Sequence, residues 1–532
     1  MDRYMPQMTG GQAVVAALES VGIDTVFGIP GVHSVEIYDA LLGSEIQHVL
    51  CRHEQGAGFM ADGYARASGR IGCVITISGP GVTNVATALA EAQGDSSCVL
   101  HICSSLDSAF AGREVGALHE LVDQSGVLKS VVKWHRSVRR VSEIPDVIAE
   151  AIHYMQSGRP GPASVEIPLD ILAERDDVTL LLVNEPGPLA PDAAAVAQAA
   201  GALSAAQSPV ILAGGGVVSG EASAELIRLA EKLGAPVLTT VSGKGAIPED
   251  HPLSVGCRWR GDDRFDTFLS AADLALVVGS RLSARHTDNW TLPMPRSIIQ
   301  VDIHSGALGR HYPTVRGIHA HAKPTLETLA ALVEDRPDEP SADTLRRIAG
   351  ARSSALNSAD PQHLGILKAI RQVLPADGLL FNDMTTICYS GPAFFPVSHP
   401  RTYFFPNYLG TLGFSFPAAL GAKLARPEAT VIALIGDGGF MFTATELSTA
   451  VQLGVSLPIV VFNDQAYSQL ERFFRLSHGR SDPFELVGPD FRANARSFGA
   501  AASRVSSPRT LRTSLAKAVE HPGPTVIEYA LS

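Results

Sequence analysis

The stretch Ala429-Thr-Val-Ile-Ala-Leu-Ile435 runs directly into Gly436-Asp437-Gly438-Gly439, and a second apolar run, residues 457–462, ends in Asn463-Asp464. Continuous apolar runs of this length are typical of strands buried on both faces of a parallel sheet. Between them, Thr443-Ala-Thr-Glu446 has the pattern of a capping box, which predicts that a helix begins there, and Gly454 is suited to end it. Strand, helix and strand form a right-handed crossover, so the sequence predicts parallel strands and an α/β fold.

Each of these two strands ends in an aspartate. Open parallel sheets bind ligands at the carboxyl edge of their strands, and the crossover brings Asp437 and Asp464 together at that edge. Two carboxylates, a backbone carbonyl and phosphate oxygens form the hard oxygen shell that Mg²⁺ prefers. The glycines let the backbone approach phosphates closely. A Gly-Asp-Gly turn alone is common, but together with an Asp at the next strand end it predicts a diphosphate and magnesium site.

In these residues the sequence resembles the thiamine-diphosphate-dependent enzymes of the acetolactate synthase and pyruvate decarboxylase family, whose signature is GDG followed by NN. The resemblance implies that Asp437, Asp464 and the carbonyl of Ala466 bind the metal. Asp464 stands where the family usually has Asn, which adds a negative charge and keeps an oxygen donor. The cofactor-binding residues that the resemblance implies in this part of the chain are Gly436, Asp437, Gly438, Gly439, Asp464, Ala466 and Tyr467.

The first part of the chain resembles the other half of the family's site. Arg52-His-Glu-Gln-Gly-Ala57 and Ala61-Asp-Gly-Tyr-Ala-Arg66 match a segment whose glutamate contacts the aminopyrimidine ring, which implies this role for Glu54. A carboxyl at the ring nitrogen promotes the imino tautomer, and the imine can then take the proton of the thiazolium carbon. The alternative is that Glu54 is one surface acid among the 54 Asp and Glu residues.

Further segments match the family around the same cofactor. Ser78-Gly-Pro-Gly-Val-Thr-Asn84 resembles a turn beside the cofactor, and Asp383-Met-Thr-Thr386 follows a strand where the family recognises the diphosphate. Gly410-Thr-Leu-Gly413 resembles the segment whose bulky residue, here Leu412, bends the cofactor, while the carbonyl of Gly410 accepts from the exocyclic amine. The residues implied are Ser78, Gly79, Pro80, Asn84, Thr385, Thr386, Gly410 and Leu412.

Two neighbouring groups within the family are closest in pattern, the acetolactate synthases and the 5-guanidino-2-oxopentanoate decarboxylases. Phe27-Gly-Ile-Pro-Gly-Val-His33, Phe59-Met-Ala-Asp62 and Leu118-His119-Glu120 look more like the decarboxylases. His119, and less strongly His33, are therefore candidates for proton transfer, although a histidine is often structural. The resemblance also implies that Leu470 faces the thiazolium, flanked by Gln469 and by Glu471, which is either a substrate ligand or a solvated acid.

The shared mechanism begins with attack of the thiazolium carbanion on the ketone of a 2-oxo acid, followed by loss of carbon dioxide. The resulting enamine is either protonated, as in a decarboxylase, or adds to a second carbonyl, as in a carboligase, and the sequence leaves both open. In this family each site combines the two halves from two chains, which implies a dimer or tetramer. Two other classes are a nicotinamide-dependent oxidoreductase, based on Gly214-Gly-Gly216, and a catalytically silent scaffold protein.

Alternating strand and helix signals predict three doubly wound parallel-sheet domains. We place the pyrimidine-binding domain at residues 1–180, a middle domain at 190–333, a linker at 334–361 and the diphosphate-binding domain at 362–532. The middle domain binds FAD in acetolactate synthases. Gly214-Gly-Gly216, Gly279-Ser-Arg281 and Asp302 fit that pattern loosely, but an MHG segment is absent after Gly256, so FAD is possible and not expected.

Composition narrows the partners. The net charge is −12 with no basic block, which argues against nucleic acid or an anionic membrane as a partner. No signal peptide or spanning segment is evident, and six scattered cysteines without a CxxC pair indicate a reduced, cytoplasmic protein. Cys98, His101 and Cys103 could be metal ligands, but they lie in an apolar strand-like run, which favours core packing.

Overall fold

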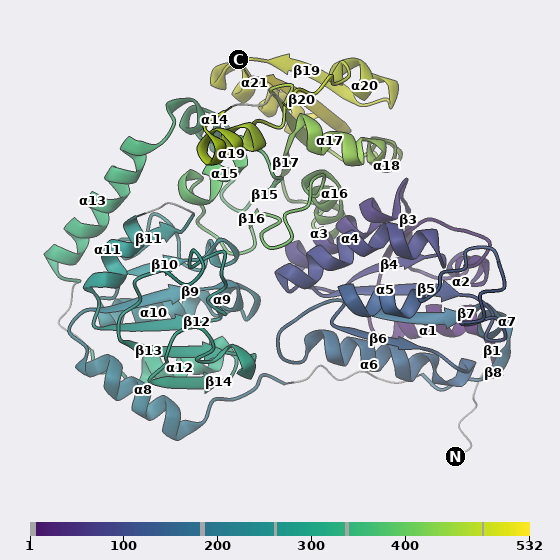
Figure 1. Ribbon diagram of the computed structural model, residues 1–532, viewed down its shortest axis with the longest axis horizontal. Helices are drawn as coiled ribbons and strands as arrows, with labels where there is room; N and C mark the ends of the chain where they lie inside the picture. The colour runs from purple at the N-terminus through teal and green to yellow at the C-terminus, as the bar shows by residue number, and fades with distance from the viewer. Residues whose placement is uncertain (1–6, 181–186, 260–262, 336–339, 481–483, 532) are drawn as a thin grey trace.

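Three six-stranded parallel sheets build the chain, each in a domain of its own (Figure 1). The computed structural model describes residues 7–180, 187–259, 263–335, 340–480 and 484–531. A two-stranded antiparallel ribbon, β1 (Gln7–Thr9) with β8 (Arg175–Asp177), joins the two ends of the first domain. The predicted α/β class and its three parallel sheets are confirmed.

The first domain has the strand order β3-β2-β4-β5-β7-β6. Its strands are β2 (Thr25–Gly28), β3 (Gln47–Leu50), β4 (Gly72–Thr76), β5 (Val99–Ser105), β6 (Trp134–Ser137) and β7 (Ala163–Pro168). Its helices are α1 (Gly10–Ser20), α2 (Val35–Leu41), α3 (Glu54–Ser68), α4 (Pro80–Asp95), α5 (Gln124–Val131), α6 (Ile144–Gln156) and α7 (Leu169–Ala173).

The third domain repeats this topology, with the order β16-β15-β17-β18-β20-β19. Its strands are β15 (Leu379–Asn382), β16 (Tyr403–Phe404), β17 (Val431–Gly436), β18 (Leu457–Asn463), β19 (Ala501–Val505) and β20 (Pro524–Ala530). Its helices are α14 (Pro361–Arg371), α15 (Thr386–Phe394), α16 (Ser415–Ala425), α17 (Asp437–Thr443), α18 (Leu447–Leu453), α19 (Ser468–His478), α20 (Phe491–Ser497) and α21 (Pro508–Glu520).

The first and third domains meet where α3 crosses α16, at equivalent places in the two topologies. A Cβ atom on Gly63 would lie 1.9 Å from the carbonyl oxygen of Ala418, and one on Gly421 would lie 1.9 Å from that of Met60. Only glycine permits this approach on each helix. One hydrophobic core therefore runs through both domains.

The middle domain has the order β11-β10-β9-β12-β13-β14, which is that of a dinucleotide-binding fold. Its strands are β9 (Pro209–Ala213), β10 (Val237–Thr239), β11 (Ser254–Cys257), β12 (Leu274–Val278), β13 (Ser297–Asp302) and β14 (Arg316–His319). Its helices are α8 (Ala193–Ala205), α9 (Gly215–Ser219), α10 (Ser223–Leu233), α11 (Arg264–Ala271), α12 (Ala322–Leu332) and α13 (Ala342–Ser358).

One local expectation is wrong. The helix after β17 begins at Asp437, not at Thr443, and Thr443 makes no capping hydrogen bond with its side chain. Gly454 does end α18 in the left-handed conformation, as expected. The linker expected at residues 334–361 contains the helix α13, which packs on the middle domain through the buried Ile348. Residues 336–339 of this linker lie outside the described part of the chain. An amphipathic helix with one buried residue carries too weak an apolar pattern to detect.

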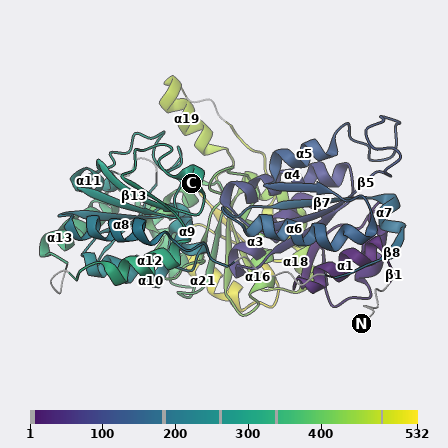
Figure 2. The same cartoon turned by 90° about the horizontal axis from the view of Figure 1, so that it is seen from below.

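Helix α19 differs from the others because none of its residues is buried. It projects from the body of the molecule (Figure 2). Among the described helices, none is both long and apolar enough to cross a lipid bilayer.

Candidate active site

The two aspartates lie together at the carboxyl edge of the third sheet. β17 and β18 are parallel neighbours, and Asp437 follows the first of them while Asp464 follows the second. The Oδ1 atom of Asp437 accepts a hydrogen bond from the amide of Gly438 at 2.7 Å, and its Oδ2 accepts from the amide of Gln465 at 2.9 Å. Asp437 is thus fixed against the turn that follows β18.

Asp464 is held by its own turn. Its Oδ1 accepts from the amide of Ala466 at 3.3 Å, and its Oδ2 accepts from the hydroxyl of Ser468 at 2.7 Å. Burial raises the pKa of Asp437 to about 6, a hydrogen bond from Gly438 opposes the rise, and the nearby charge of Asp464 adds to it. Two facing carboxylates repel each other, and a divalent cation between them would remove that repulsion.

The residues present therefore fit a magnesium ion. Ala466 forms a bridge to Glu485 in which the hydrogen bonds are made by its neighbours Gln465 and Tyr467, so its carbonyl takes no part in that bridge. No group of three or more His, Cys, Asp or Glu side chains that could hold a metal occurs in the described residues. The predicted set has only two such side chains, with a carbonyl and diphosphate oxygens completing the shell.

A cavity of about 380 Å³ opens beside this pair. Gly438 is required on its wall, because a Cβ atom there would lie 2.6 Å from the ring of Tyr467. The residues lining the cavity are Asp437, Gly438, Met441, Phe442, Tyr467, Leu486, Val487, Gly488, Pro489 and Phe491.

The predicted diphosphate segment lies against the same glycines. Thr385 precedes α15, and a Cβ atom on Gly436 would lie 3.1 Å from its hydroxyl oxygen. The side chain of Gln469 donates to the hydroxyl of Thr386 at 3.5 Å, which connects the start of α19 to this segment. Thr385 thus lies against the glycine turn, and Thr386 lies against the start of α19.

Asp383 is a residue that the sequence analysis missed as part of the site. It is fully buried, and its carboxylate accepts from the amides of Met384 at 2.8 Å and Ser415 at 3.0 Å. Burial raises its pKa to about 6, against these backbone hydrogen bonds. Asp383 fixes the diphosphate segment to the start of α16, and the available signal was an Asp directly after a buried strand.

Gly410 and Leu412 stand just before α16. Gly410 has a φ of +71°, which explains the glycine, and a Cβ atom there would lie 3.0 Å from the side chain of Met384. Leu412 is partly exposed, although a leucine would by its residue type be expected in the core. Leu470 lies on α19 and is 46% exposed.

In the first domain, Glu54 is the first residue of α3 and is largely buried. Its Oε2 accepts from the side-chain amide of Asn84 at 2.9 Å, and Asn84 lies on α4. The hypothesis that Glu54 is a solvated surface acid is therefore wrong.

His33, Ser78 and His119 form one cluster. The Nδ1 atom of His33 lies 2.7 Å from the hydroxyl of Ser78, and the rings of His33 and His119 are 4.8 Å apart. Burial and the neighbouring His119 lower the pKa of His33. The Nδ1 atom of His119 is buried and has no hydrogen-bond partner among the described residues. His119 closes over the predicted turn, because a Cβ atom on Gly79 would lie 2.5 Å from its carbonyl oxygen.

The candidate site residues form two sets in different domains. The Glu54 set, in the first domain, comprises Glu54, Asn84, Ser78, His33 and His119, and the Asp437 set, in the third domain, comprises Asp437, Asp464, Ala466, Thr385 and Thr386. Glu446 of the third domain contacts the segment directly before Glu54. It is fully buried and accepts from the amides of Arg52 at 3.1 Å and His53 at 3.0 Å, directly before Glu54. Thr449 donates to its other oxygen at 2.7 Å. The sequence analysis assigned Glu446 to a capping box, so its role in holding the Glu54 segment was missed.

The residues considered as metal ligands in the first domain are part of the core. His101 is fully buried on β5, with Thr76 and Ser164 hydroxyls each 2.9 Å from its ring nitrogens. Burial lowers the pKa of His101 to about 3, so it is neutral. Cys98 and Cys103 are free thiols. The preference for core packing is confirmed.

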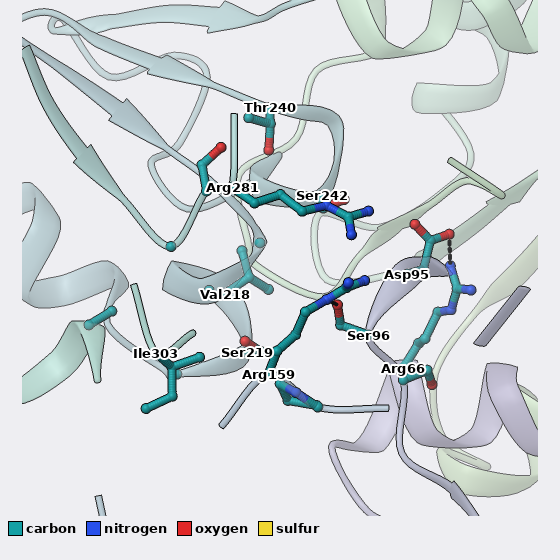
Figure 3. Close-up of a pocket in the computed structure, with 18 of the residues that line it drawn as sticks. Arg66, Asp95, Ser96, Arg159, Val218, Ser219, Thr240, Ser242, Arg281 and Ile303 are labelled. Carbon is teal, nitrogen blue, oxygen red and sulfur yellow. Dashed lines mark hydrogen bonds and ion pairs between the residues drawn. The ribbon is translucent and has the colours of Figure 1, made fainter. Parts of the chain in front are cut away.

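A second cavity, of about 520 Å³, lies where the three domains meet, and Arg159 and Arg281 extend into it (Figure 3). Its wall includes Gly216 and Gly279. These two glycines belong to the segments that resemble, loosely, the FAD-binding domain of acetolactate synthases. Their Cβ atoms would lie 2.5–2.6 Å from each other's backbone, so the packing of the start of α9 against the turn after β12 already requires both glycines. The expectation against FAD thus rests on the segment missing after Gly256.

Sequence comparison identifies three successive domains. The sequence model of the thiamine pyrophosphate enzyme N-terminal TPP binding domain matches residues 8–127, that of the central domain matches residues 196–329, and that of the C-terminal TPP binding domain matches residues 383–529.

Similar proteins cover almost the whole chain. A probable 2-ketoarginine decarboxylase of Pseudomonas aeruginosa is 39% identical over 98% of this chain and 94% of that protein. A probable acetolactate synthase large subunit of Methanocaldococcus jannaschii is 32% identical over 98% of this chain and 92% of that protein. The acetolactate synthase isozyme 1 large subunit of Escherichia coli is 32% identical over 99% of this chain and 94% of that protein.

These matches give no support to a nicotinamide-dependent oxidoreductase. The chain belongs to the thiamine-diphosphate-dependent enzymes of the acetolactate synthase and 2-oxo acid decarboxylase family.

Proposed function

We propose that the chain is a decarboxylase of a 2-oxo acid that holds thiamine diphosphate and Mg²⁺ between the Glu54 set and the Asp437 set. The observation that carries this proposal is the paired carboxylates at the end of the third sheet, with the diphosphate segment beside them. When bound, thiamine diphosphate supplies a carbanion that attacks the ketone and an electron sink for the pair released with carbon dioxide.

The chain's own residues would position the cofactor and the metal and would transfer protons. Glu54 would hydrogen-bond the pyrimidine nitrogen of the bound cofactor and exchange a proton with it, and Asn84 donates a hydrogen bond that orients the Glu54 carboxylate. Asp437, Asp464 and the carbonyl of Ala466 would hold Mg²⁺, and Thr385 and Thr386 would donate to the diphosphate. The histidine cluster delivers a proton at the position where carbon dioxide leaves.

We favour protonation over carboligation because two histidines and a serine hydroxyl meet beside the Ser78 turn. The similarity to a protein named as a probable 2-ketoarginine decarboxylase agrees with this choice. It also makes 5-guanidino-2-oxopentanoate the first substrate to test, with Glu471 as a candidate ligand for the guanidinium group. Glu471 forms an ion pair with Arg475 at 2.8 Å, which a cationic substrate would have to displace.

Product analysis tests the proposed reaction. With a panel of 2-oxo acids, each with and without an aldehyde or second 2-oxo acid as acceptor, we expect equal amounts of carbon dioxide and the shortened aldehyde by mass spectrometry. The expected reason is that a nearby proton donor reacts faster than a diffusing acceptor. A hydroxyketone or acetohydroxy acid as the main product would contradict the decarboxylase and favour the carboligase.

The active enzyme should be a dimer or a tetramer of this chain. Large apolar side chains are exposed beside both sets, and such a concentration marks an interaction surface. They are Val32, Leu118 and Val122 near the histidines, Leu409 next to Gly410, Met441 and Phe442 on the wall of the Asp437 cavity, and Leu470, Phe473 and Leu476 on α19. Light scattering should give at least twice the 56.1 kDa of one chain. A fully active species with the mass of one chain would contradict the shared site.

A further inference from the structure

Glu91 reaches from the first domain to the segment that precedes α16. It is fully buried on α4, and its Oε2 accepts from Thr411 twice, from the amide at 3.2 Å and from the hydroxyl at 2.7 Å. Thr411 lies between Gly410 and Leu412. The same helix carries Asn84, the partner of Glu54, so α4 contacts both sets of site residues.

The other oxygen of Glu91 has no hydrogen-bond donor in the described residues, and neither has one oxygen of Asp95. The atoms are Glu91 Oε1 and Asp95 Oδ1, both fully buried, and the two residues are one helical turn apart on α4. The second oxygen of Asp95 is satisfied by Arg66 at 3.0 Å and by the amide of Asn407 at 3.0 Å. Figure 3 shows the pairing of Arg66 with Asp95 at the edge of the larger cavity.

Two ionised carboxylates one helical turn apart would be energetically costly in this buried position, because one oxygen of each lacks a hydrogen-bond donor and the two negative charges repel each other. A single proton between them satisfies both. Burial and the negative charge of Asp95 raise the pKa of Glu91 to about 8, with a hydrogen bond to Asp95 contributing, while Arg66 and Thr411 oppose the rise. Glu91 is accordingly the protonated member at neutral pH.

We propose that Glu91 is a positioning residue, which shares one proton with Asp95 and thereby holds the Gly410–Leu412 segment in the place that cofactor activation needs. This inference rests on the proposed contacts of Gly410 and Leu412 with the cofactor. Glu446 shows the equivalent contact in the other direction, from the third domain to the segment before Glu54. Both oxygens of Glu446 have hydrogen-bond donors, so it requires no shared proton.

The charged groups around the pair favour this distribution of the proton. From α3, Arg66 pairs with Asp95 at 3.0 Å and with Asp62 at 2.6 Å, so a positive charge lies directly beside Asp95. Arg159, from the segment before β7, acts on Asp95 through its charge. The segment at residues 407–411 contributes the neutral groups of Asn407, Tyr408 and Thr411, and Arg281 lies over the ring of Tyr408 at 4.1 Å.

The sign of the pH dependence follows from the raised pKa. The shared proton is present below a pH of about 8 and is lost as the pH rises through that value. Above it, two adjacent buried carboxylates repel each other, and the contact with Thr411 is disturbed. The turnover number of the wild type should therefore fall on the alkaline side, while the KM for substrate changes little.

Glu91→Gln tests the shared proton directly. The carboxamide oxygen can accept from Thr411 and its NH₂ group can donate to Asp95, so this variant mimics the protonated acid and cannot titrate. At pH 7 we expect turnover within about threefold of the wild type, and an alkaline decline moved upward by roughly one pH unit or more. Glu91→Leu, which removes the acceptor, should lose about tenfold or more in turnover at every pH.

Infrared spectroscopy of the protein without cofactor gives a readout independent of catalysis. The carbonyl band of a protonated carboxylic acid should be present at pH 7, should titrate away near pH 8, and should be absent from Glu91→Gln. Glu225→Gln is the matched control, since Glu225 is also buried with one unpartnered oxygen, but lies on α10 in the middle domain. It should leave the infrared band and the pH profile unchanged.

Three results for Glu91→Gln would overturn the inference. They are an alkaline decline in turnover at the same pH as in the wild type, loss of turnover at pH 7, and an infrared band of the carboxylic acid that is unchanged from the wild type. If Glu91→Leu fails to fold, the Glu91→Gln results still decide. Failure of the proposed function is distinguished by Glu54→Gln. Full activity in that variant would contradict the assigned chemistry, whereas an inactive Glu54→Gln with an unaltered Glu91→Gln profile contradicts only the role of Glu91.

Discussion

Asp437→Ala should weaken the binding of thiamine diphosphate with Mg²⁺ by roughly tenfold or more, as measured by titration calorimetry. The carboxylate of Asp437 is fixed by the amides of Gly438 and Gln465 and faces Asp464 across the turn. Its removal takes away one of two charged oxygen ligands, and it leaves the amide of Gln465 with Asn463, at 3.2 Å, as its one remaining side-chain acceptor among the described residues. Both effects reduce affinity for the metal and, through it, for the diphosphate.

Two matched variants separate the metal site from general damage. Asp273→Ala removes a carboxylate that also accepts from two backbone amides, those of Gln207 and Ser208, but in the middle domain, and it should leave binding unchanged. Asp464→Asn introduces the residue that the family usually carries, and the amide oxygen can replace the carboxylate as a ligand. It should change binding much less than Asp437→Ala. Unaltered binding in Asp437→Ala would refute the metal assignment.

Glu54→Gln should lower turnover by roughly 10²-fold or more, which is the scale of losing a general acid–base group. The carboxamide oxygen can still accept from Asn84, so the side chain keeps its place at the start of α3. What is lost is the exchangeable proton at the pyrimidine. Cofactor affinity should change much less than turnover, because the missing interaction matters chiefly in the transition state.

Exchange of the thiazolium C2 proton with solvent, followed by NMR, should slow in parallel with turnover in Glu54→Gln. Glu36→Gln is the control, since Glu36 lies in the first turn of α2, a second helix of the same domain. It should leave turnover and exchange unchanged. Wild-type turnover and exchange in Glu54→Gln would mean that Glu54 is not the activating acid and that the first domain is assigned wrongly.

The sequence by itself determined the fold class and the two ends of the site. A buried strand that ends in Gly436-Asp437-Gly438 must deliver those residues to the carboxyl edge of a parallel sheet, and the next strand must deliver Asp464 beside them. Glu54 was proposed from its flanking residues, and the structure places it at the start of α3 with Asn84 as its partner. These features are encoded locally, within one crossover or one segment, so a pattern of neighbouring residues reveals them.

Only the tertiary structure decided which residues hold those two ends in place. The helix after β17 begins at Asp437, and Glu446, which the sequence suggested as a capping residue, instead holds the amides before Glu54. Glu91 reaches Thr411 from the other domain, and Asp383 ties the diphosphate segment to α16. The first two contacts exist because α3 and α16 cross at Gly63 and Gly421, and the third because α16 packs against its own sheet. All join segments distant in the chain, so no local pattern of residues records them.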